Sequence, residues 1–190
     1  MRKMWIMAVA ASLVMTAFGN NEKSEQNAAP QTSKTVLVAY FSATGNTAKV
    51  AKSLTAATGA TIFEIKPAKA YTSADLDWNN KQSRTTLEMN NEKARPAIAN
   101  KVANMQQYQV IYLGFPIWWG KAPRIINTFL EQYNLKGKTI IPFCTSGGSG
   151  IEGAMKLIKA SAPTANWKNG KLLNGNPSET ELKSWAKTIK

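Results

Sequence analysis

A nearly continuous apolar run, TVLVAYF, occupies residues 35–41 and leads directly into a polar loop and a segment with helical spacing. A strand without polar alternation has both faces covered, which is typical of the parallel sheets in α/β domains. Because parallel strands need crossover connections, this pattern predicts a strand, loop and helix unit at the start of the domain.

The same alternation continues along the chain. Further strands are predicted at residues 60–65, 110–115, 139–144 and 172–173, and helices at 48–57, 123–133, 151–161 and 177–190. Strands that alternate with helices predict an α/β fold with a doubly wound parallel sheet of five strands and helices on both faces. The connection at 66–109 is long, and we expect a helix there with Ile98, Val102 and Met105 on one face.

The amino terminus has the composition of a secretory signal peptide at residues 1–19. Arg2 and Lys3 precede a mostly apolar stretch that is shorter than the roughly 20 residues of a membrane-spanning helix. Residues 20–34 predict a flexible linker, so the domain occupies 35–190. We expect export to a bacterial periplasm, with no membrane span after processing. A lipid anchor is not expected, because Phe18 stands where a lipoprotein signal carries its Cys.

The residue inventory excludes several kinds of active site. The chain has no His and one Cys, Cys144, which excludes Ser-His-Asp triads, Cys-His dyads, the usual zinc sites and an internal disulfide. A phosphatase loop after Cys144 would need Arg where Gly150 stands. We therefore interpret Cys144 as a buried structural residue, and predict neither a metal site nor a catalytic side chain.

The charge is strongly basic, with 24 Lys and Arg against 11 Asp and Glu and a formal net charge of +13. Removal of Arg2 and Lys3 leaves most of this excess in the domain and linker. The lysines are scattered and no nucleic-acid motif accompanies them, so we predict no nucleic-acid partner. A solvated surface with weak attraction to acidic partners or anionic membranes accounts for the charge.

Ligands of open parallel sheets bind at the carboxyl ends of the strands, where this sequence has unusual loops. The first loop consists of Ser42, Ala43, Thr44, Gly45, Asn46 and Thr47. Its hydroxyl and amide groups precede a helix, whose amino terminus attracts a phosphate. The loop lacks GxxxxGK[ST] and GxGxxG, so it is neither an ATP-binding P-loop nor a dinucleotide fingerprint. A plain helix cap is the alternative.

Two further loops follow the third and fourth predicted strands. The second loop consists of Pro116, Ile117, Trp118, Trp119 and Gly120. Its adjacent indoles predict either stacking on a flat aromatic ligand or packing over the edge of the sheet. The third loop lacks bulky side chains, which allows its backbone to lie close against a ligand. Its candidate residues are Thr145, Ser146, Gly147, Gly148 and Gly150.

The motifs AYFSATGNT, GFPIWWG and PFCTSGGSG, in this order, resemble those of bacterial flavodoxin-like FMN-binding proteins over most of residues 35–190. The resemblance implies a sheet of order 2-1-3-4-5 and one non-covalent FMN. It implies that the first loop holds the phosphate, the second lines the isoalloxazine and the third borders its other side. The segment containing Trp78, Arg84 and Glu88 resembles the same branch and is expected to fold over the flavin.

A flavodoxin-like FMN protein is expected to transfer electrons to a redox partner protein or a small-molecule acceptor. Two alternatives remain, an FMN-dependent NAD(P)H:quinone or nitro-type oxidoreductase and a non-catalytic binding module, because fold alone does not decide function. The chain differs from acidic electron carriers in its charge, and its third loop has no aromatic residue to stack on the flavin. Lys121 and Arg124 are the cations nearest the second loop, where they would raise the flavin reduction potential.

Overall fold

The computed structural model of the chain describes residues 35–188. The predicted signal peptide and linker lie outside the described residues, as does Ile189 at the end of the last predicted helix. Within the described range, no helix has the length and apolar character needed to cross a membrane.

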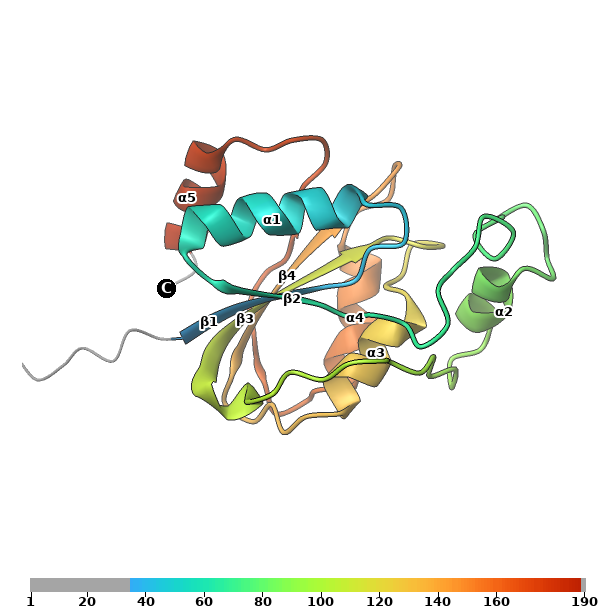
Figure 1. Cartoon of the computed structure of the whole chain (residues 1–190), viewed down its shortest axis with the longest axis horizontal. Helices are drawn as coiled ribbons and strands as arrows, with labels where there is room; N and C mark the ends of the chain where they lie inside the picture. The colour runs from blue at the N-terminus through green and yellow to red at the C-terminus, as the bar shows by residue number, and fades with distance from the viewer. Residues whose placement is uncertain (1–34, 189–190) are drawn as a thin grey trace, which may run out of the picture. The chain divides into compact units, whose positions relative to one another are not determined.

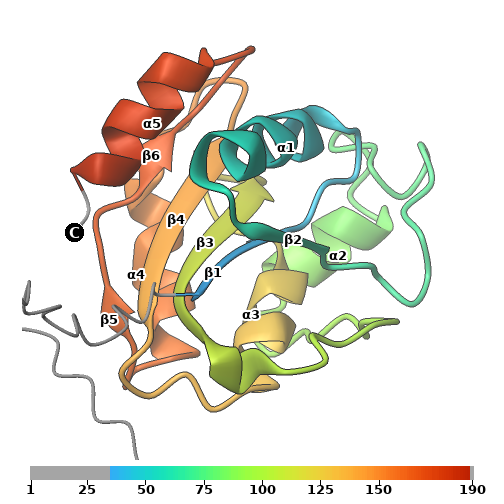
Figure 2. The ribbon, with the colours of Figure 1, turned by 60° about the vertical axis from the view of Figure 1, so that its left-hand side comes forward.

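The described residues form one sheet in which every neighbouring pair of strands is parallel. Its strands are β1 (Thr35–Tyr40), β2 (Thr61–Glu64), β3 (Tyr108–Pro116), β4 (Thr139–Thr145), β5 (Asn166–Trp167) and β6 (Lys171–Leu172). The order is β2-β1-β3-β4-β5, and the short β6 also pairs with β4. This confirms the predicted order 2-1-3-4-5, with β5 and β6 sharing the fifth position (Figure 2).

Helices cover both faces of the sheet, as predicted for a doubly wound fold. One face carries α1 (Asn46–Thr58) and α5 (Glu179–Lys187), and the other carries α3 (Arg124–Glu131) and α4 (Glu152–Ala160) (Figure 1). The long connection between β2 and β3 contains α2 (Arg84–Asn90) and a single 3-10 turn, η1 (Met105–Gln107).

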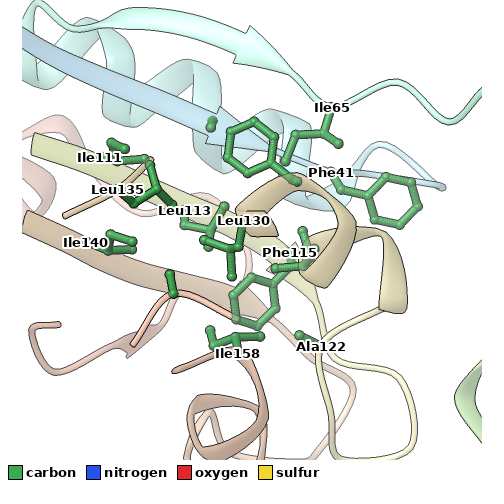
Figure 3. Close-up of a cluster of buried hydrophobic side chains, with 14 of the residues drawn as sticks. Phe41, Ile65, Ile111, Leu113, Phe115, Ala122, Leu130, Leu135, Ile140 and Ile158 are labelled. Carbon is green, nitrogen blue, oxygen red and sulfur yellow. The ribbon is translucent and has the colours of Figure 1, made fainter. Parts of the chain in front are cut away.

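The apolar run of β1 is explained by two cores, one on each face of the sheet. Leu37 and Ala39 belong to the cluster under α3 and α4, whereas Val38 and Tyr40 belong to the cluster under α1 and α5. Alternate residues therefore enter opposite cores, as the two-residue period of a strand requires. In the first cluster, strand residues Leu113 and Ile140 meet Leu130 of α3 and Ile158 of α4 (Figure 3).

The fifth strand differs from the prediction of one strand at 172–173. On this edge of β4, the carbonyl of Ile140 accepts from Lys168 N and that of Cys144 accepts from Leu173 N. By the two-residue period, Pro142 faces the same edge, and proline has no N–H to donate. The ladder is interrupted opposite Pro142, which divides the fifth strand into β5 and β6.

The helix predicted around residues 98–105 is wrong apart from the turn η1. Ile98 instead forms an antiparallel bridge with Pro67. The side chain of Asn100 donates to the Glu64 carbonyl at 2.8 Å and accepts from Lys66 N at 3.1 Å. These contacts hold the segment extended beside the end of β2, so contacts distant in sequence override the local helical spacing.

Cys144 is fully buried, as predicted. Burial, reinforced by Glu152, raises the pKa of its thiol from an ordinary value of 9.0 to about 12. The neutral thiol is therefore favoured in the fold, and its contribution to stability is lost as the pH rises from 9 towards 12. At pH 8 we expect a disulfide reagent such as DTNB to label Cys144 no faster than the protein unfolds. Rapid labelling of the native protein would contradict this burial.

Candidate functional site

An open cavity of about 770 Å³ lies at the carboxyl ends of the strands. We call it the main cavity. It is lined by Thr44, Asn46, Lys49, Pro116, Ile117, Thr145, Ser146, Gly147, Asn174, Gly175 and Asn176. Its volume falls in the range of roughly 300–1,000 Å³ that is usual for small-molecule sites. The structure thus brings the three predicted loops together and adds a fourth, which follows β6.

The first loop presents the amino terminus of α1 without a cap. Gly45 has a φ of 89°, in the left-handed region, and its N–H donates to Ser42 Oγ at 3.1 Å. Side chains cap α2 (Ser83) and α5 (Ser178), whereas in the described chain α1, α3 and α4 have no side-chain cap; of these three, α1 begins at the main cavity, which Asn46 lines. The first N–H groups of a helix have no partner within it. The plain-cap alternative therefore fails, and these donors remain for a ligand.

A buried pair of hydroxyl groups joins the first loop to the third. Thr47 Oγ1 and Thr145 Oγ1 are 2.8 Å apart, and either can be the donor. The hydroxyl that accepts this hydrogen bond keeps its own proton for another acceptor. Since Thr145 also lines the main cavity, the pair fixes the distance between the two loops and supplies a polar group to the cavity.

One side chain of the fourth loop, that of Asn174, holds the third loop in place. Asn174 Oδ1 accepts from Ser146 N at 2.9 Å, and Asn174 Nδ2 donates to the Ser146 carbonyl at 2.8 Å. Ser146 Oγ then accepts from the N–H groups of Gly148 and Ser149 at 3.1 and 2.9 Å. Asn174 was not among the predicted site residues, although it directly follows the last predicted strand and so had to lie at this edge of the sheet.

Replacing Asn174 with Ala is expected to loosen the third loop. Both hydrogen bonds to Ser146 are lost, which should lower the free energy of unfolding by about 1–2 kcal/mol. Urea unfolding measures this change, and faster hydrogen exchange at the Ser146 amide locates it. Asn176→Ala is the matched control, because Asn176 lies in the same loop without a described hydrogen bond to Ser146. Unchanged exchange at Ser146 in Asn174→Ala would contradict the proposed restraint.

A second cavity, of about 380 Å³, adjoins the main cavity. It is lined by Thr44, Leu76, Trp78, Thr85, Ile117, Trp118 and Trp119. Thr44 and Ile117 belong to both cavities, which places the two side by side. The structure therefore puts both tryptophans of the second loop against this second cavity, while Pro116 and Ile117 face the main one.

The segment between β2 and α2 is anchored to the second loop through Tyr71. The Tyr71 hydroxyl donates to Glu88 at 2.6 Å, Arg84 Nε donates to Glu88 at 2.7 Å, and the Arg84 guanidinium lies 3.9 Å from the centre of the Tyr71 ring. The same ring packs edge-on against Phe41 and Trp118. Burial and the hydrogen bond to Glu88 raise the pKa of Tyr71, so it stays a neutral donor.

The remaining predicted residues shape the loops without lining the main cavity. They are Ser42, Ala43, Gly45, Thr47, Gly120, Gly148 and Gly150. Arg124 does not line the main cavity, because its side chain is buried and donates to the Met89 carbonyl of α2 at 3.2 Å; its nearness to a ligand stays a prediction. Among the described residues that line the main cavity the one cation is Lys49, which was not among the predicted site residues. Because α1 begins at Asn46, Lys49 lies three residues further on the same helix face.

Comparison with protein families identifies this architecture. The flavodoxin family model matches residues 35–189. The chain belongs to the flavodoxin family. Two solved structures from Bacteroides, both described as flavoproteins, resemble this flavodoxin-family chain over nearly their whole length. The one from B. eggerthii is 54% identical, with a TM-score of 0.78, and the match covers 82% of this chain and 97% of that one.

The second Bacteroides structure, from B. uniformis, is 52% identical, with a TM-score of 0.77, and the match covers 81% of this flavodoxin-family chain and 98% of that one. A flavoprotein from Lactobacillus acidophilus, solved in complex with FMN, is 22% identical with a TM-score of 0.65. That match covers 80% of this chain and 99% of that chain, and at this identity it shows a shared fold. No curated protein matches the chain significantly.

Proposed function

We propose that this flavodoxin-family protein binds one FMN non-covalently in the main cavity and carries electrons to a redox partner protein or a small acceptor. The observation that carries the proposal is the uncapped amino terminus of α1 at a cavity of ligand size. Flavodoxin-family membership and the FMN complex of the Lactobacillus flavoprotein support the choice of cofactor.

The residues of the first loop fit a phosphate. Thr44 and Asn46 bring a hydroxyl and an amide to the cavity wall, and Lys49 adds a positive charge. Among the described residues lining the main cavity none is acidic, so no carboxylate would repel a dianion. The free N–H groups and the dipole at the amino terminus of α1 also favour binding of an anion. Lys49 therefore supports the proposed phosphate site by adding a cation to its neutral hydroxyl and amide groups.

The other walls fit a flat ring system. Pro116 and Ile117 offer an apolar surface, and on the opposite loop Gly147 leaves the backbone accessible. Ser146 is held in place by Asn174, so these walls are ordered before a ligand enters. When bound, FMN supplies reversible electron transfer, while the protein residues bind and orient it. That Trp118 and Trp119 also line the isoalloxazine stays a prediction.

Anaerobic mixing with NADH or NADPH distinguishes a carrier from a reductase. As a carrier, the FMN-loaded protein is expected to keep its flavin absorbance in excess NAD(P)H, and to lose it on photochemical reduction. Addition of an oxidant should then restore the absorbance. Rapid bleaching by either nucleotide would contradict the carrier role and establish the NAD(P)H-dependent alternative.

We also propose that residues 1–19 direct export and that the holoprotein assembles in the periplasm. The basic start and short apolar stretch support this proposal. The mature chain is expected to begin at Asn20, which intact mass measurement of the fractionated protein would detect. FMN-loaded protein recovered only from the cytoplasm, with Met1 retained, would overturn it.

A further inference from the structure

The second loop turns sharply, with a tryptophan at its tip. Trp118 and Lys121 exchange two backbone hydrogen bonds of 2.9 Å, which closes a two-residue hairpin. Its central residues, Trp119 and Gly120, have φ values of 49° and 70°. Turns with positive φ at both central positions favour Asn, Asp and Gly, and a bulky residue there is strained. Backbone strain of this kind is typical of functional sites.

Trp119 and a second tryptophan from a different segment both reach the second cavity. The exposed fraction is 42% for Trp119 and 72% for Trp78, although large apolar side chains usually lie inside a protein. Every residue lining the cavity is uncharged, in a chain whose net charge is +13. The cavity is therefore an apolar recess with two accessible indoles on a basic protein, which favours a neutral aromatic ligand.

The wall that carries Trp78 is ordered by polar contacts. Thr85 donates to the Asp75 carbonyl twice, from its hydroxyl at 2.7 Å and from its N–H at 3.1 Å. Asp75 in turn accepts from the N–H and the hydroxyl of Thr72. Together with the contacts of Tyr71, these bonds fix the stretch that contains Leu76 and Trp78 against α2. The recess is thus formed without a ligand, which lowers the entropic cost of binding.

We propose that the second cavity binds an uncharged, planar molecule of about two fused rings, of the quinone class, against the indoles of Trp78 and Trp119. A volume of about 380 Å³ admits one such molecule, whereas a helix of a partner protein is roughly 10 Å across with its side chains. The choice of an electron acceptor rests on the proposed function. The recess shares Thr44 and Ile117 with the main cavity, so a molecule bound there would lie beside the proposed FMN.

Equilibrium dialysis of the full chain with menadione, an uncharged two-ring quinone, tests the inference with and without FMN. We expect saturable binding of one menadione per chain. Trp78→Ala should weaken this binding about tenfold through the lost stacking surface. Trp119→Asn should weaken it to a similar extent without lowering the urea midpoint of unfolding, because Asn suits the turn. Leu87→Ala removes an exposed apolar side chain of α2 outside the recess, and should bind like the parent protein.

The outcomes separate this inference from the proposed function. Menadione binding that neither tryptophan variant weakens, or no binding by a chain that binds FMN, would overturn the inference and leave FMN binding intact. A chain that binds menadione in a tryptophan-dependent way but does not bind FMN would support the recess and overturn the proposed function.

Discussion

Asn46→Asp is expected to weaken FMN binding about a hundredfold while leaving the fold as stable as before. Asn46 is the first residue of α1 and lines the main cavity, where we place the phosphate. Asp has nearly the same shape but adds a negative charge. At an effective dielectric constant of about 20, like charges about 4 Å apart repel by about 4 kcal/mol, more than the ~2.7 kcal/mol of a hundredfold change.

The same substitution should affect folding in the opposite direction. A negative side chain at a helix amino terminus stabilises the helix by about 0.3–1 kcal/mol. Loss of FMN affinity with an unchanged or higher urea midpoint therefore separates a binding defect from a folding defect. Titration with quenching of FMN fluorescence measures the affinity, and urea unfolding of the FMN-free protein measures the stability.

Two controls make the Asn46→Asp result specific to the phosphate. Riboflavin has the same ring system without the phosphate, so the substitution should leave its affinity nearly unchanged. Asn79→Asp makes the same change in charge at an exposed position outside both cavities, and should bind FMN like the parent protein. Equal losses for FMN and riboflavin would mean that the phosphate lies elsewhere.

Gly114→Ala is expected to lower the free energy of unfolding by about 2–3 kcal/mol. Gly114 of β3 lies opposite Phe143 of β4, and a Cβ at Gly114 would overlap the Phe143 ring. That ring is fully buried in the core under α1 and α5, in the same cluster as Leu54 and Leu182. Protein cores are closely packed, so the added methyl group would strain the neighbouring side chains.

Urea unfolding of Gly114→Ala should show a lower midpoint with an unchanged slope. Gly148→Ala is the matched control, because a Cβ there has no atom within 4 Å, and its midpoint should stay close to that of the parent. Adding Phe143→Leu to Gly114→Ala should recover part of the loss by making room for the methyl group. A Gly114→Ala protein as stable as the parent would contradict the packing described for β3 and β4.

The sheet could be predicted from the sequence because its signal is local. The strands of the centre are apolar throughout, since alternate residues such as Leu37 and Val38 enter opposite cores. The errors arose where a partner distant in sequence determines the local structure. Asn100 holds its segment extended beside β2, and Pro142 interrupts the fifth strand. Neither effect is visible in the periodicity of the segment that it changes.

The candidate site could also be predicted only where its signal is local. Three loops could be found from their composition, because parallel strands bring their carboxyl ends to one edge. The fourth loop, with Asn174, follows a strand whose pattern is short and weak. Lys49 was missed because its place in the main cavity depends on the residue at which α1 begins. The anchoring of Tyr71 by Arg84 and Glu88 depends on side-chain contacts within a segment without a clear period.

The absorbance spectrum of the purified full chain, taken after exposure to FMN and removal of the excess, tests the central claim most directly. The account predicts a flavin absorbance band equivalent to one FMN per chain, and full release of that FMN when the protein is denatured. A colourless protein that is folded by circular dichroism would contradict FMN binding. Flavin that stays attached to the denatured chain would contradict the non-covalent site.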